Sequence, residues 1–256
     1  MHIIDTHAHL MDSAFKEDFE DVWERTFENI QAIINIGCNF KDAKVAVELA
    51  HRHENSFASV SLHPIDAKDY TEEGWENLKV LANDEKVCAI GETGLDYHWK
   101  TSTKEEQQLV FVKHIELAKS INKPLIIHDR DAHRDTCDIL WENKAEVVGG
   151  VFHAYSGSVE LTKEILEHNF YISLGGVVTF KNAKTVKEVA KTIPLDRLLI
   201  ETDCPYLTPE PFRGKRNEPS YVIYVAKEIA RLRNISFDSL IQITYENASR
   251  LFKFKL

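Results

Sequence analysis

The chain has 256 residues, 43% of them hydrophobic, which is enough for a sizeable core in one large α/β domain or two small ones. Its formal net charge is −10, so the surface as a whole should repel nucleic acid and membrane anions. A polyanionic substrate must then be held by local positive charge, chiefly metal ions, and a nucleic-acid-binding module without chemistry fits poorly.

Cysteine usage and the N-terminal segment bear on the cellular compartment. The cysteines are scattered and form no Cys-x-x-Cys motif, so we expect free thiols in a reducing compartment. They are Cys38, Cys88, Cys137 and Cys204. No secretory leader pattern precedes the first strand, and no apolar run is long enough to span a bilayer. We therefore expect a cytoplasmic protein without a membrane partner.

Apolar strand-like segments alternate with amphipathic helical patterns along the chain. The first strand begins at Ile3 and runs into His7-Ala8-His9. Further strands are predicted at residues 32–36, 57–62, 87–91, 125–127, 150–152, 170–174 and 198–200. Helices are predicted at residues 15–29, 41–53, 103–121, 132–143, 159–168, 184–192, 221–232 and 237–252, with another around Trp75. Thr103 and Glu106 form the pattern of a capping box at the start of the longest helix.

Eight strand and helix units at this spacing predict an α/β fold, a closed (β/α)₈ TIM barrel. Most of the strands are continuously apolar, as expected when both faces of a sheet are covered. The sequence shows no linker and no second composition class, so we expect one domain over residues 1–256. A compact chain without an evident self-pairing strand is expected to be a monomer.

Histidines and acids follow most of the predicted strands. They are His7 and His9 after the first strand, His63 after the third, Glu92 after the fourth, His128 after the fifth, His153 after the sixth and Asp203 after the eighth. In a barrel these strand ends form one rim, where active sites are built. Such nitrogen and oxygen donors suit Zn, Mn, Co or Mg, and their number exceeds the needs of one ion. The set therefore predicts two divalent metal ions bridged by a carboxylate and water.

Some histidines have a second interpretation. His63 could touch a substrate phosphate rather than a metal ion, or it could have a structural role before Pro64. Histidines on helices or at helix ends are expected to be surface or packing residues. These are His51, His53, His114 and His168.

Six segments, in this order, resemble the TatD family of metal-dependent deoxyribonucleases. They are Asp5-Thr6-His7-Ala8-His9-Leu10, Gly91-Glu92-Thr93-Gly94-Leu95-Asp96, Ile127-His128-Asp129-Arg130, His153-Ala154-Tyr155-Ser156-Gly157, Glu201-Thr202-Asp203-Cys204-Pro205-Tyr206 and residues 213–219. The resemblance covers the whole chain. It implies an amidohydrolase-type TIM barrel that hydrolyses DNA phosphodiester bonds, as a 3′-5′ exonuclease on single-stranded DNA or DNA 3′ ends. Asp129 stands where that family usually has a small residue, which adds negative charge near the mouth of the barrel.

The resemblance also implies a ligand set for each of the two ions. By position, one ion would be held by His7, His9, Glu92 and Asp203, and the other by Glu92, His128 and His153. Glu92 would be the bridge. Related barrels use a carboxylated lysine there, but no lysine ends a strand in this chain.

Three residues are the candidate catalytic groups. Asp203 could orient the attacking water and accept its proton, while Glu92 would hold both ions. Assistance to the departing oxygen is open between His63, Arg130 and a water on the metal.

Substrate contacts are predicted from the loops that follow the strands. The candidate residues are His63, Arg130, Tyr155 and Arg213. Bases of single-stranded DNA could stack on loop aromatics while cations hold the backbone. The aromatics are Tyr97, Trp99, Tyr155, Tyr206 and Phe212, and the cations are Arg130, Arg213, Lys215 and Arg216. The alternative is that these aromatics pack the loops and the cations form surface ion pairs. Without an extended basic face, binding should be weak and salt-sensitive.

Two alternative functions remain open at this point. A di-metal deacylase or amidohydrolase acting on an ester or amide, such as aminoacyl-tRNA, would use the same metal ions. A barrel that keeps metal for stability or binds a partner would be non-catalytic, although the presence of both Asp203 and His63 argues against a degenerate site.

Overall fold

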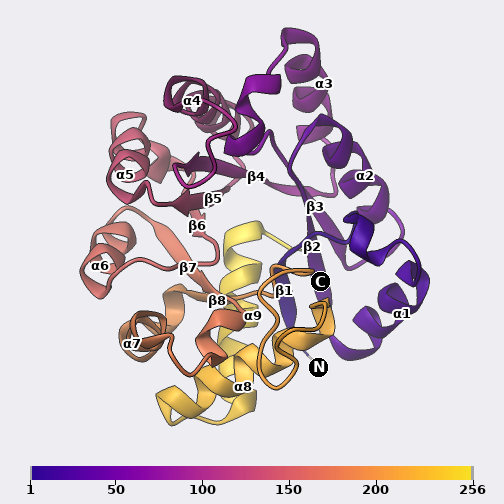
Figure 1. The fold of residues 1–256 in the computed structure, drawn as a ribbon, viewed down its shortest axis with the longest axis vertical. Helices are drawn as coiled ribbons and strands as arrows, with labels where there is room; N and C mark the ends of the chain where they lie inside the picture. The colour runs from indigo at the N-terminus through magenta and orange to yellow at the C-terminus, as the bar shows by residue number, and fades with distance from the viewer. Residues whose placement is uncertain (1, 255–256) are drawn as a thin grey trace. The chain divides into compact units, whose positions relative to one another are not determined.

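Helices and strands alternate along residues 2–254, which the computed structural model describes (Figure 1). The strands are β1 Ile4–Ala8, β2 Ala32–Gly37, β3 Ser56–Val60, β4 Val87–Asp96, β5 Leu125–Arg130, β6 Gly150–Phe152, β7 Phe170–Leu174 and β8 Leu198–Ile200. The α-helices are α1 Phe19–Asn29, α2 Phe40–Ala50, α3 Glu72–Ala82, α4 Lys104–Ile121, α5 His133–Glu142, α6 Val159–Glu167, α7 Lys184–Thr192, α8 Val222–Arg233 and α9 Phe237–Phe252.

The eight strands follow one another in chain order in one sheet, from β1 to β8. The registered pairs β3–β4, β4–β5, β5–β6 and β7–β8 are parallel. The end of β1 also pairs in parallel with the chain after β8, through the bridge between Ala8 and Cys204. Strand order and helix alternation confirm the predicted (β/α)₈ TIM barrel.

The chain forms two compact units. The first unit comprises the described residues up to Ile34, His153–Leu166 and the described residues from Tyr171 on, and in it α9 packs on β1 and β8. The second unit comprises Asn35–Phe152 and Glu167–Phe170, and in it α3 packs on β3 and β4 while α4 packs on β4. The single domain over residues 1–256 stays a prediction.

Strand β4 is longer than the sequence predicts, because it continues through Gly91 and Gly94 to Asp96. Two glycines in four residues are typical of a turn, but here they allow close approach to β5. A Cβ at Gly91 would lie 2.5 Å from the carbonyl oxygen of Ile126, and one at Gly94 would overlap the carbonyl oxygen of His128. The glycines therefore bring the ends of β4 and β5, which carry Glu92 and His128, side by side.

Replacing Gly94 with alanine should destabilise the protein by roughly 2–4 kcal/mol, since strain and overpacking add. Its φ is +141° and its Cβ would meet the β5 backbone. Gly214→Ala is the matched control, because Gly214 has a φ of +86° but nothing within 4 Å of an added Cβ. The Gly214→Ala variant should lose only about 1 kcal/mol of unfolding free energy. Urea unfolding measures both, and equal losses would contradict the close approach of the two strands.

Helix boundaries differ from the sequence predictions by a few residues. The predicted helix at 15–29 begins at Phe19, because the side chain of Asp12 accepts a hydrogen bond from the Ala14 amide and starts a separate 3₁₀ turn, Ser13–Phe15. The predicted capping box is confirmed. The Glu106 amide donates to Thr103 Oγ1 at 3.2 Å, and the Thr103 amide donates to Glu106 Oε2 at 2.7 Å.

Two predictions from composition can be compared with the structure. All four cysteines are free thiols, as predicted. Among residues 2–254 there is no helix with the length and apolar character needed to cross a bilayer.

Candidate metal centre

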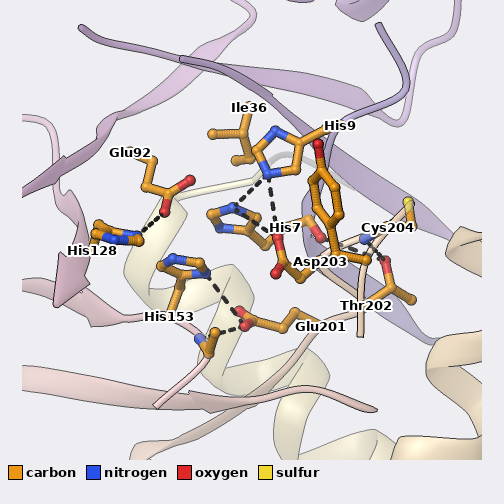
Figure 2. Close-up of polar contacts among 12 residues, drawn as sticks. His7, His9, Ile36, Glu92, His128, His153, Glu201, Thr202, Asp203 and Cys204 are labelled. Carbon is orange, nitrogen blue, oxygen red and sulfur yellow. Dashed lines mark hydrogen bonds and ion pairs between the residues drawn. The ribbon is translucent and has the colours of Figure 1, made fainter. Parts of the chain in front are cut away.

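The first unit gathers three histidines and an aspartate at the carboxyl ends of β1, β6 and β8 (Figure 2). His7 Nε2 lies 3.2 Å from His9 Nε2, and Asp203 Oδ1 lies 3.3 Å from His9 Nε2. The ring of His153 stacks on that of His7 at 3.9 Å between centroids. Ligand atoms of His7, His153 and Asp203 all lie within 4.8 Å of one another. We call these four residues the first-unit cluster.

Asp203 presents its carboxylate to the histidines from a left-handed backbone conformation, with a φ of 58°. Its amide donates to the carbonyl oxygen of His7 at 2.9 Å, which fixes the chain after β8 against β1. Burial raises the pKa of Asp203, but the hydrogen bond with His9 and the charges of His7 and His153 outweigh it, so the pKa lies below its usual value. Asp203 is therefore ionised at neutral pH.

Two buried acids support the first-unit cluster, and the sequence reasoning gave neither of them a role. Asp5 accepts hydrogen bonds from the Thr202 amide at 2.9 Å and the Thr202 hydroxyl at 2.5 Å, which ties β1 to the chain after β8. Burial raises the pKa of Asp5 to about 8, although the hydrogen bonds from Thr202 oppose this shift. Glu201 Oε1 accepts from the Ala154 amide at 2.5 Å and lies 3.6 Å from His153 Nδ1 (Figure 2).

The second unit gathers His63, Glu92 and His128. His63 follows β3, Glu92 lies on β4 and His128 lies on β5. Glu92 Oε1 is 2.5 Å from His128 Nδ1 and 3.4 Å from His63 Nε2. The two rings lie edge to face at 4.4 Å between centroids. Ligand atoms of all three residues lie within 4.8 Å of one another. We call them the second-unit cluster, and Figure 2 shows its contact between Glu92 and His128.

His63 is arranged as a hydrogen-bond donor. Its Nδ1 accepts from the Ile65 amide at 3.2 Å, so in the neutral ring Nε2 carries the proton and points it at Glu92. Burial and the charge of His128 lower the pKa of His63, against the opposing influence of Glu92. These contacts favour a hydrogen bond to substrate, one of the alternatives left open by the sequence, over a ligand role.

His114 confirms the expectation of a packing residue. It is fully buried, and its Nε2 accepts from the Leu62 amide at 3.1 Å, next to His63 in the chain. Burial lowers the pKa of His114 to about 4, so it is neutral. It stabilises the segment that carries His63.

Both clusters fit divalent metal ions. Each combines imidazole nitrogens with one buried or nearly buried carboxylate, a donor set suited to Zn, Mn, Co or Mg–Mn chemistry. A divalent cation bound at either cluster would be coordinated by the histidine nitrogens and the carboxylate oxygens, which now contact one another directly. The number of ions and the bridging role of Glu92 stay predictions.

The residues predicted to contact substrate have different surroundings. Tyr155 is only 4% exposed, and its hydroxyl donates to the carbonyl oxygen of Ser158, which favours the packing alternative. Arg213 lies over the ring of Phe180 at 3.7 Å. Arg130 lies on the surface, 5.8 Å from the ring centroid of Trp99.

Some of the other loop aromatics and cations stabilise the loops, and others are exposed. Phe212 stacks on Tyr221 at 4.5 Å, and Arg216 forms an ion pair with Asp18 at 2.6 Å, so both stabilise the loop after β8. Trp99 and Tyr206 are 53% and 54% exposed, so part of each side chain faces solvent.

Asp129, which departs from the family pattern, is compensated locally. Its Oδ2 lies 2.6 Å from His133 Nδ1. This hydrogen bond raises the pKa of His133, although partial burial opposes the shift. At a pH below the pKa of His133, the positive charge of its ring therefore balances the negative charge of Asp129.

The Asp129–His133 pair should make stability depend on pH. Because the folded-state pKa of His133 is raised, its contribution is present below the unfolded-state pKa of about 6.5 and is lost as pH rises through the folded value. Urea unfolding of the wild type and His133→Gln should give a larger difference in unfolding free energy near pH 6 than near pH 8.5. If the difference in unfolding free energy instead increased with pH, the Asp129–His133 pair would not be a stabilising contact of protonated His133.

Comparisons with known proteins identify the family of this chain. A family model described as TatD related DNase matches residues 4–253. The chain is 52% identical to the metal-dependent hydrolase YabD of Bacillus subtilis, over 98% of this chain and 99% of that protein. It is 38% identical to YcfH of Escherichia coli, over 98% of this chain and 96% of that protein.

Solved structures give the same result. The structure of YjjV, a TatD homologue from Escherichia coli, superposes with a TM-score of 0.92 at 28% identity and covers 98% of both chains. A TatD family hydrolase from Entamoeba histolytica gives a TM-score of 0.88 at 26% identity, again over 98% of both chains. The chain belongs to the TatD family of metal-dependent hydrolases.

Proposed function

We propose that this hydrolase cleaves DNA phosphodiester bonds, as a 3′-5′ exonuclease on single-stranded DNA, with two divalent metal ions. The observation that carries the proposal is the pair of buried histidine and carboxylate clusters in a chain of the TatD related DNase family. The proposed ligands are His7, His9, Glu92, His128, His153 and Asp203. Ions held by such donors activate water and neutralise charge on phosphate oxygens.

The protein's own residues would move protons in this reaction. Asp203 is ionised at neutral pH and would accept a proton from the attacking water. His63 presents Nε2–H, which would donate to a phosphate oxygen or to the departing 3′ oxygen. This division of roles assigns the base to Asp203 and the donor to His63.

Trp99 is proposed to stack on an unpaired base, with Arg130 nearby for the backbone. Its indole is 53% exposed, and its amide donates to Asp96 Oδ1, which ties the turn to the end of β4. Stacking on an aromatic residue contributes about 1–3 kcal/mol per base, so Trp99→Ala should raise KM for single-stranded DNA by about tenfold with little change in kcat.

Leu109→Ala is the matched control for Trp99→Ala. Leu109 lies on α4 of the same unit and is 58% exposed, but it is not in a loop that follows a strand. Its removal should leave KM within about twofold of the wild type. A KM that is unchanged in Trp99→Ala, or raised equally in Leu109→Ala, would exclude stacking at this position.

A substrate panel tests the proposed activity. Single-stranded DNA labelled at the 5′ end, single-stranded RNA and an aminoacyl ester would be incubated with Mg²⁺, Mn²⁺ or Zn²⁺. The proposal predicts a ladder of DNA products shortened one nucleotide at a time from the 3′ end. Cleavage of the ester alone would favour the deacylase alternative and contradict the proposal.

A further inference from the structure

We infer that Asp96 is a positioning residue that fixes the orientation of the His128 ring for metal binding. Asp96 Oδ2 accepts a hydrogen bond from His128 Nε2 at 2.8 Å, and Asp96 is only 1% exposed. The inference rests on the proposed ligand role of His128 and is independent of the substrate.

The second carboxylate oxygen of Asp96 has a separate task. Oδ1 accepts from the amides of His98 and Trp99 at 3.0 and 2.9 Å, which closes the turn after β4. Asp96 therefore uses one oxygen for the turn and the other for His128. An ionised carboxylate can serve both sides at once, because each of its oxygens is an acceptor.

The backbone of Asp96 is itself held in place by Gln107 of α4. The Asp96 amide donates to Gln107 Oε1 at 2.8 Å, and Gln107 Nε2 donates to the Asp96 carbonyl oxygen at 2.9 Å. Gln107 is 2% exposed, so this pair of hydrogen bonds is shielded from water. These buried hydrogen bonds fix the backbone from which the Asp96 carboxylate extends.

The contact with Asp96 decides which nitrogen of His128 can bind a cation. Nε2 donates to Asp96, and Nδ1 lies 2.5 Å from Glu92 Oε1, a contact between a ring nitrogen and a carboxylate that holds a proton when no cation is bound. A cation would take the place of that proton at Nδ1, while Nε2 keeps its hydrogen bond to Asp96. Carboxylates in this position fix the tautomer and orientation of a ligand histidine and raise its basicity. Asp96 would act on the metal through His128, without touching it.

Two variants separate this role from the closing of the turn. Asp96→Asn has a single oxygen acceptor and can serve only one side. Asp96→Ser can still cap the turn through its hydroxyl, but its side chain is too short to reach His128. Both should bind Mn²⁺ at the affected site about 10–100-fold more weakly in calorimetric titration, the usual effect of losing such a partner.

Asp135→Asn is the matched control. Asp135 Oδ2 accepts from the Tyr97 hydroxyl at 2.8 Å in the same unit, so it is a half-buried carboxylate acceptor whose partner is Tyr97 rather than His128. Its Mn²⁺ affinity should stay within about twofold of the wild type. Thermal unfolding without metal shows that each variant is folded before titration.

A double-mutant cycle distinguishes the possible outcomes. His128→Gln alone tests the ligand role, and unchanged Mn²⁺ binding in that variant would contradict the proposed function. If Asp96 acts through His128, then adding Asp96→Ser to His128→Gln should cause no further loss. Unchanged Mn²⁺ affinity in Asp96→Ser, or an equal loss with and without His128, would overturn the inference.

Discussion

Replacing Asp203 with alanine is expected to lower kcat by roughly 10²–10⁴-fold, the range associated with loss of a general base. The structure gives this residue a carboxylate that is ionised at neutral pH and lies 3.3 Å from His9 and 3.8 Å from His7. Its loss would remove both a ligand and the proposed proton acceptor. Steady-state kinetics on a short labelled single strand, at saturating Mn²⁺, measures the effect.

Leu174→Val is the control for Asp203→Ala. Leu174 ends β7 in the same unit and is fully buried, so its shortening removes one methylene from the core and no polar group. Stability should fall by about 1 kcal/mol, while kcat should stay within about twofold of the wild type. Equal losses of kcat in the two variants would show that Asp203 has no special role.

Glu92→Gln is expected to weaken Mn²⁺ binding by more than about 100-fold, because even partners of ligand residues contribute 10–100-fold. The amide keeps the shape of the side chain but removes the negative charge that faces His63 and His128. If Glu92 serves both ions, as the family resemblance implies, two binding events should weaken together in calorimetry. Turnover should fall at least as far as in Asp203→Ala.

Glu106→Gln is the corresponding control on the surface. Glu106 belongs to the capping box of α4, and its N3 position accepts either glutamate or glutamine. Both the Mn²⁺ affinity and the unfolding free energy should remain close to the wild type. Unchanged Mn²⁺ binding in Glu92→Gln would remove Glu92 from the ligand set.

The sequence predicted the barrel because its strands are short, apolar and regularly spaced, so burial on both faces leaves a clear signal. The same regularity predicted His128 and Asp203 at the carboxyl ends of strands, and the structure has His128 on β5 and Asp203 shortly after β8. Strand β4 was predicted too short, since Gly91 and Gly94 have the composition of a turn and their close packing on β5 is a tertiary property.

Side-chain partnerships were harder to predict than strand ends. Asp96 lies in a recognised motif, but its contact with His128 depends on the extension of β4 and on Gln107, eleven residues further along. Tyr155 could have met substrate or packed the loop, and its burial and the hydrogen bond from its hydroxyl to the Ser158 carbonyl oxygen favour packing. Position in the chain indicates which loop a residue occupies, whereas packing decides which way it points.

Manganese anomalous scattering from a crystal grown with Mn²⁺ tests most directly whether the strand-end histidines and acids hold two cations. One peak is expected beside His7, His9 and Asp203 and a second beside His128 and His153, with Glu92 in contact with both. A fully occupied crystal with no peak at either cluster, or with these side chains bonded only to protein, would contradict it.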